Sequence, residues 1–138
     1  MVTIQVSREL SAEFNKVWEI IADVDRDPEF WHGTKSIKNT KKKANIIERE
    51  VVISFRNSIC KEIVTLDPKK AIKIRIIDGP MRGTKNIIIN DMGNNKTRID
   101  VEWNIMLVGF LRLFSRMVKK HILAGTEEAL ERISKTVE

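Results

Sequence analysis

The chain has 138 residues, of which 42% are hydrophobic and 32% charged, and its formal net charge is +6 at pH 7. This length is typical of one domain that buries its own core, and we expect residues 1–138 to form a single domain. The apolar runs are far shorter than the roughly 20 residues that span a bilayer, so we predict no transmembrane segment. The single cysteine, Cys60, excludes an internal disulfide and a cysteine-based metal cage within one chain.

The N-terminal segment begins as a strand and continues as helices. Apolar and polar side chains alternate up to about Leu10, which is typical of a half-buried strand. Ser11 is then placed to cap a helix. The apolar face of this helix recurs at three- and four-residue spacing: Phe14, Val17, Trp18, Ile21 and Val24. Asp27-Pro28 interrupts the pattern and predicts a second, short helix that closes at Gly33.

The opening sequence MVTIQVSREL also bears on location. It contains no basic leader, no apolar signal core and no small-residue cleavage site. We therefore expect a cytoplasmic protein.

From Thr34 to Leu107 the apolar period is mostly two, which predicts about six further strands. Turn-forming residues divide this region at Asn39 to Lys43, Arg56-Asn57, Asp67-Pro68, Asp78-Gly79-Pro80 and Asp91 to Asn95. Such short connections favour antiparallel neighbours, and each strand has one apolar and one wet face. The apolar face of this sheet needs a cover.

The C-terminal segment is expected to provide that cover as one long helix from Phe110 to about Lys135. Its apolar stripe consists of Phe114, Val118, Ile122, Gly125, Ala129 and Ile133. Gly125 costs roughly 1 kcal/mol relative to alanine within a helix, and it permits either a bend over a cavity or close packing. The predicted fold class is therefore α+β, with about seven antiparallel strands, two short helices after the first strand and a long C-terminal helix.

A lysine-rich segment is expected at the hairpin between the second and third strands. Lys41, Lys42 and Lys43 could make weak contacts with an anionic surface, such as the phosphates of lipid or RNA. No aromatic side chains are interleaved with them, as base stacking requires. We favour a solvated hairpin tip, and we do not expect nucleic-acid binding.

The order of these elements, together with the segment SRELSAEFNKVWEIIADVDRDPEFW, resembles the START and birch-pollen-allergen superfamily. This superfamily, also called SRPBCC, includes the polyketide cyclase/dehydrase and lipid transport type, and the resemblance covers essentially the whole chain. It implies the helix-grip fold, in which a curved antiparallel sheet grips the C-terminal helix and encloses a mostly apolar cavity. A ligand pocket between the sheet and that helix is therefore expected.

We predict that this pocket is built from the short helices, one long strand and the C-terminal helix. Its expected lining is Phe30, Trp31, Ile99, Val101, Trp103, Ile105, Phe114, Met117, Val118 and His121. The alternative interpretation is that these side chains simply fill the core, because such stripes usually pack. The two interpretations carry equal weight.

His121 is the one candidate for acid–base chemistry, because it falls on the apolar arc of the C-terminal helix. We favour a structural histidine over a catalytic one. His32 is expected in a loop at the cavity mouth, where surface polarity explains it. With two histidines, one cysteine and no paired metal-binding motif, we predict no metal site, and no cofactor is expected.

Three functional hypotheses follow. We favour a noncatalytic binding or transport protein for a small hydrophobic molecule, such as a lipid, an isoprenoid or a polyketide-like ring system, driven by burial of apolar surface. The alternative is a polyketide cyclase/dehydrase-like enzyme that uses the same cavity, with His121 moving a proton. A third hypothesis is an interaction module that contacts RNA, a ribosome or a protein through its basic strand face.

Overall fold

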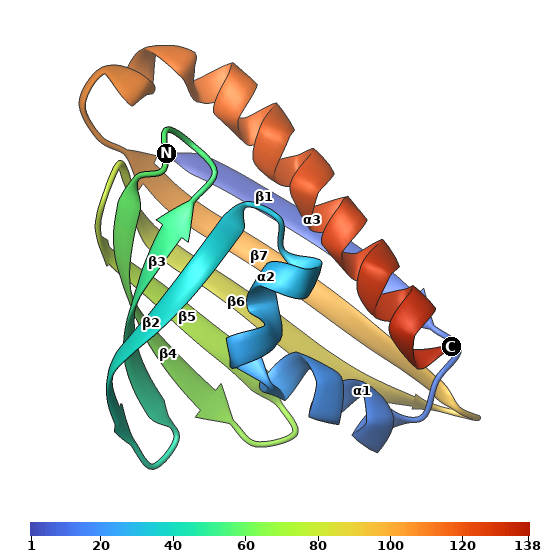
Figure 1. Cartoon of the computed structure of the whole chain (residues 1–138). Helices are drawn as coiled ribbons and strands as arrows, with labels where there is room; N and C mark the ends of the chain where they lie inside the picture. Colours follow the sequence, from blue (N-terminus) through green and yellow to red (C-terminus); the bar gives the residue numbers. More distant parts are fainter.

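The computed structural model describes residues 1–138 and consists of a curved antiparallel sheet with a long helix lying across one face (Figure 1). The strands are β1 (Val2–Leu10), β2 (Thr34–Lys43), β3 (Ile46–Ile53), β4 (Ile59–Asp67), β5 (Ala71–Asp78), β6 (Met81–Gly93) and β7 (Lys96–Leu107). The helices are α1 (Phe14–Ala22), α2 (Asp27–Phe30) and α3 (Ser115–Val137), with 3₁₀ turns η1 (Val24–Arg26) and η2 (Gly109–Phe114). The predicted α+β helix-grip architecture is confirmed.

The seven strands follow the order β1-β7-β6-β5-β4-β3-β2, so the first and last strands of the chain pair with each other. Every other neighbour is a sequential antiparallel pair, as the short predicted turns require. The period of two is clear in β5, where Ile72, Ile74 and Ile76 are buried and the intervening Lys73 and Arg75 are exposed. One face of the sheet is therefore apolar and faces the helices.

The two edges of the sheet differ. β1 packs against α3, whereas β2 pairs with β3 on one side and has no strand on the other. β2 is almost entirely exposed, and its register with β3 shifts at two places. The strand continues to Lys43 and the turn begins at Ala44, so the predicted turn at Asn39 to Lys43 is wrong.

Two helix boundaries also differ from the prediction. The carboxylate of Glu13, and not the side chain of Ser11, caps α1 by accepting a hydrogen bond from the backbone N–H of Asn15 at 3.1 Å. The backbone N–H of Ser11 instead donates to the Glu138 carboxylate at the other end of the chain. The predicted C-terminal helix is divided, since η2 forms a separate 3₁₀ turn before α3 begins at Ser115. No helix is both long enough and apolar enough to cross a membrane.

The apolar core has two parts. The larger packs α1, α2 and the end of α3 against the sheet around residues such as Val17, Ile99 and Leu130. The smaller lies around η2, where Leu111 packs with Ile105. In Figure 1 the end of α3 lies close to α1, while its beginning stands over the opposite end of the sheet.

Candidate functional site

A cavity of about 540 Å³ lies between the sheet, the segment that follows α2, η2 and the first half of α3. It is lined by 23 residues. Its 12 hydrophobic residues are Trp31, Ile53, Phe55, Cys60, Ile74, Ile76, Met81, Trp103, Leu111, Met117, Val118 and Ile122. A concave, mostly apolar lining of this volume suits a small hydrophobic molecule.

Half of the residues predicted from the sequence lie in this lining: Trp31, Trp103, Met117, Val118 and His121. The other half lie outside it: Phe30, Ile99, Val101, Ile105 and Phe114. His121 is exposed on the surface of α3 and reaches the cavity at its mouth, together with His32.

The residues outside the lining have clear positions elsewhere. Ile99 and Val101 are fully buried in the larger part of the core, and Ile105 in the smaller part. Phe30 is buried in the larger part, while Phe114 is exposed and packs edge-to-face on Phe110 of η2. Residues on one apolar strand face thus divide between solid core and cavity wall, according to what lies above them.

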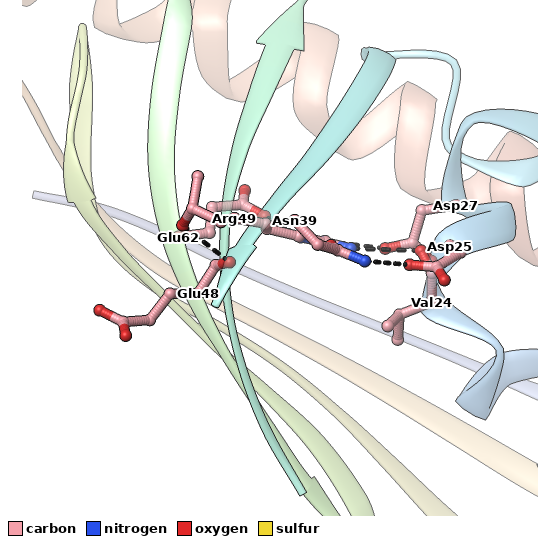
Figure 2. A network of polar contacts seen from close by, with 8 residues as sticks. Val24, Asp25, Asp27, Asn39, Glu48, Arg49 and Glu62 are labelled. Carbon is pink, nitrogen blue, oxygen red and sulfur yellow. Dashed lines mark hydrogen bonds and ion pairs between the residues drawn. The ribbon is translucent and has the colours of Figure 1, made fainter. Parts of the chain in front are cut away.

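A buried ionic cluster, which the sequence analysis did not predict, borders the cavity (Figure 2). Arg49 of β3 donates from Nε to Glu62 Oε1 and from Nη2 to Asp27 Oδ2, both at 2.9 Å. Its Nη1 donates to the carbonyl oxygen of Val24. Arg49 and Glu62 are paired in register across β3 and β4, and Asp27 comes from α2. We call Asp27, Arg49 and Glu62 the Arg49 cluster.

Burial and ion pairing act in opposite directions on these groups. Burial lowers the pKa of Arg49, but the charges of Glu62 and Asp27 outweigh it and raise the pKa above its usual value. Burial raises the pKa of Asp27, and Arg49 and Lys85 oppose that rise. Because a guanidinium is always charged, the cluster holds a fixed positive group beside the apolar lining.

Lys85 of β6 is the second buried cation of the cavity and is only 7% exposed. Its ammonium lies over the Trp31 ring, 3.1 Å from the centroid, and 4.9 Å from the centroid of the Trp103 ring. Burial lowers the pKa of Lys85 to about 8, although Asp27 and Glu62 oppose this shift.

The strand pattern contained a signal for these charged residues. Arg49 lies between the inward-facing Ile47 and Val51, and Lys85 precedes the inward-facing Ile87 by two residues. Arg49 and Lys85 are therefore charged residues at core-facing positions of strands in which buried and exposed residues alternate. Such a position requires a buried partner or a cavity, because an isolated charge is costly to bury.

One hydrogen bond joins the sheet to α3 at the edge of the cavity. Trp103 Nε1 donates to Thr126 Oγ1 at 3.0 Å, and the same hydroxyl donates to the carbonyl oxygen of Ile122 at 2.7 Å. At the preceding residue, a Cβ atom placed on Gly125 would meet no atom within 4 Å. Close packing at Gly125, one of the two predicted roles, is therefore excluded, and the glycine borders open space.

Cys60 faces the cavity from β4. Burial, with smaller contributions from Glu62 and Asp78, raises the pKa of its thiol to about 11. A thiol in this environment stays protonated at neutral pH and is a poor nucleophile. The chain contains no group of three or more His, Cys, Asp or Glu side chains arranged to hold a metal ion.

Comparisons with known proteins agree on the fold. A family model described as polyketide cyclase/dehydrase and lipid transport matches residues 1–138. A protein of Thermus thermophilus is 15% identical with a TM-score of 0.83, covering 98% of this chain and 96% of its own. The Zhui aromatase/cyclase from a Streptomyces species is 12% identical, with a TM-score of 0.82 and coverage of 98% and 92%. A START superfamily protein from Mycobacterium smegmatis is 16% identical, with a TM-score of 0.73 and coverage of 99% and 97%. A search of curated protein sequences found no match.

Proposed function

Because the chain belongs to the polyketide cyclase/dehydrase and lipid transport family, we propose that it binds a small hydrophobic molecule in the cavity under α3. The observation that carries this proposal is the cavity itself, about 540 Å³ in volume with a mostly apolar wall. Ligand pockets commonly measure about 300–1,000 Å³ and combine apolar walls with a few polar groups. Here Arg49 and Lys85 are such polar groups.

Native mass spectrometry of the freshly purified protein tests this proposal first. We expect a copurified hydrophobic compound near one per chain, which solvent extraction then identifies. An empty protein that also takes up no apolar fluorescent probe would contradict the proposal.

A pair of variants tests whether the cavity is the binding site. Gly125→Phe places a ring where a side chain meets open space beside the cavity, so we expect probe binding to fall at least tenfold. Glu127→Phe adds the same ring to an exposed position of α3 outside the lining and should bind like the parent protein. Equal binding by both variants would place the ligand elsewhere.

The second candidate is a cyclase or dehydrase that uses the same cavity. It is favoured by the family's description and by the position of His121 in the lining. An enzyme should convert the extracted compound on incubation, and His121→Ala should abolish that conversion while binding persists. If the chain only binds the compound, the parent protein and His121→Ala should both release it unchanged.

The third candidate, an interaction module that uses the basic strand face, differs in its response to salt. Contacts with phosphates weaken steeply as salt rises, whereas capture of an apolar molecule barely changes. Binding of an RNA oligonucleotide measured across a salt series therefore tests this candidate, while the apolar probe tests the first two.

A further inference from the structure

Lys85 occupies an unusual position on the apolar face of the sheet. It is paired in register with Ile74 of β5 on one side and with Trp103 of β7 on the other. Its neighbours along β6 on the same face, Ile87 and Ile89, are buried. The side chain is 7% exposed, and the surface that it lines belongs to the cavity.

Two aromatic rings hold the ammonium in place. Its Nζ atom lies over the face of Trp31 and near that of Trp103, at the two centroid distances given above. The face of an aromatic ring attracts a cation but offers no oxygen or nitrogen lone pair to accept a hydrogen bond from it. An indole N–H is itself a donor and cannot accept from an ammonium, and that of Trp103 donates to Thr126. The rings therefore position the ammonium without satisfying its donors.

The carboxylates of the cavity are occupied by a different cation. Asp27 and Glu62 are both paired with Arg49 at 2.9 Å. Lys85 forms no ion pair and no side-chain hydrogen bond with the protein. Every fully buried polar side-chain atom has a hydrogen-bond partner, so the ammonium of Lys85 is not fully buried and is reached from the cavity. An ammonium has three donors and no acceptor. The donors of Lys85 consequently face the cavity.

We propose that the ligand of this cavity carries an anionic oxygen group, a carboxylate or an ionised enol or phenol, which Lys85 binds while the apolar body lies against Trp31 and Trp103. This inference rests on the proposed function, because it assigns a chemical class to the ligand of the same cavity. A charge-assisted hydrogen bond at a water-poor site discriminates strongly between head groups on one apolar chain. The lowered pKa of Lys85, about 8, agrees with an ammonium that lacks a direct protein partner.

Competition against an apolar fluorescent probe at neutral pH tests the assignment in the parent protein. Dodecanoate, dodecanol and dodecylammonium share one alkyl chain, and each is used below its micelle concentration. We expect dodecanoate to bind about tenfold more tightly than dodecanol, and dodecylammonium to bind most weakly. Equal binding of the three would overturn the role of Lys85 while leaving the proposed function intact. Preference for dodecylammonium would assign the cavity to the carboxylates of the Arg49 cluster instead. If neither the three compounds nor the probe bind, both proposals are overturned.

Variants then locate the discrimination. Lys85→Met keeps an unbranched side chain, one atom shorter, and removes its charge, so dodecanoate should lose its tenfold advantage over dodecanol. Lys73→Met makes the same change on the exposed face of β5 and should keep the preference. Retention of the preference by Lys85→Met would contradict the proposal. Since the head-group comparison in the parent protein needs no variant, the proposal remains testable even if Lys85→Met folds poorly.

Discussion

The two halves of α3 perform different tasks although one apolar stripe runs through both. In residues 126–137 the stripe is buried, with Leu130, Ile133 and Val137 packed into the larger part of the core. In residues 115–125 no side chain is buried: Val118 and Ile122 are half-buried above the cavity and Met117 is 60% exposed. We call these the closed half and the open half.

The comparison teaches that a helix can be anchored at one end and serve as a cavity roof at the other. The hydrogen bond between Trp103 and Thr126 marks the junction. The closed half contributes packing energy, while Val118 and Ile122 in the open half are only partly buried against the smaller part of the core, so an apolar ligand can add contacts to them. Stability should therefore depend on the closed half and binding on the open half.

The largest effect is expected at the Arg49 cluster, which borders the cavity and is held together by buried ion pairs. Arg49→Met leaves Asp27 and Glu62 buried without their partner, and we expect a loss of about 3–5 kcal/mol in the free energy of unfolding. Urea denaturation measures this change. Arg75→Met, on the exposed face of β5, is the control and should change stability little. A small effect of Arg49→Met would show that water reaches Asp27 and Glu62 in the variant and replaces their lost partner.

The two halves of α3 can be compared directly with one substitution at two positions. Ile133→Ala removes a side chain that is 2% exposed and should cost about 3 kcal/mol in unfolding free energy. Ile122→Ala makes the same change over the cavity, and we expect it to cost less than about 1 kcal/mol while weakening probe binding. Equal losses of stability at both positions would contradict the division into halves.

The pH dependence of stability tests the charge on Lys85. Its folded-state pKa of about 8 lies below the ordinary value of 10.5, so the unfolded chain binds more protons between these two values. The parent protein should therefore gain stability relative to Lys85→Met as pH rises through that window. Between pH 8 and pH 10.5 we expect the parent protein to gain about 3 kcal/mol in unfolding free energy relative to Lys85→Met. Urea titrations of both proteins across the window measure the difference, and a constant difference would contradict the burial of an ammonium.

The smallest effect concerns the open half alone. Gly125→Ala adds a methyl group that meets no atom within 4 Å, and alanine favours a helix over glycine. We expect the variant to be more stable by about 1 kcal/mol, measured as a rise in Tm. A loss of stability would show that α3 needs the glycine for its path over the cavity.

The sequence predicted the architecture well because periodicity reports which face of each element is apolar. The alternation in β5 and the C-terminal half of the α3 stripe, with Ala129 and Ile133, correspond to buried faces in the structure. Periodicity does not report whether an apolar face meets other side chains or an empty space. Ile99 and Trp103 share one face of β7, yet the first lies in solid core and the second in the cavity wall.

The ionic part of the site was missed for a different reason. Arg49, Glu62 and Lys85 come from β3, β4 and β6, and only the folded sheet, with α2 packed on it, brings them to one cavity. A single charged residue in a strand of alternating polar and apolar residues resembles a surface residue until it is known which alternate positions face the core. Once Ile47 and Val51 are assigned to the core, Arg49 must share their face.

The exposed edge strand β2 gives the lysine-rich segment a further consequence. An edge strand, unpaired on one side, offers free backbone N–H and C=O groups to any other extended chain, which is a route to aggregation. Lys38, Lys41, Lys42 and Lys43 are exposed along β2, and the register shifts beside Thr34 and Asn39 distort its edge. Two copies that approach through β2 would bring like charges together on a poorly matched ladder. The lysines therefore discourage strand addition at the one edge that α3 leaves open.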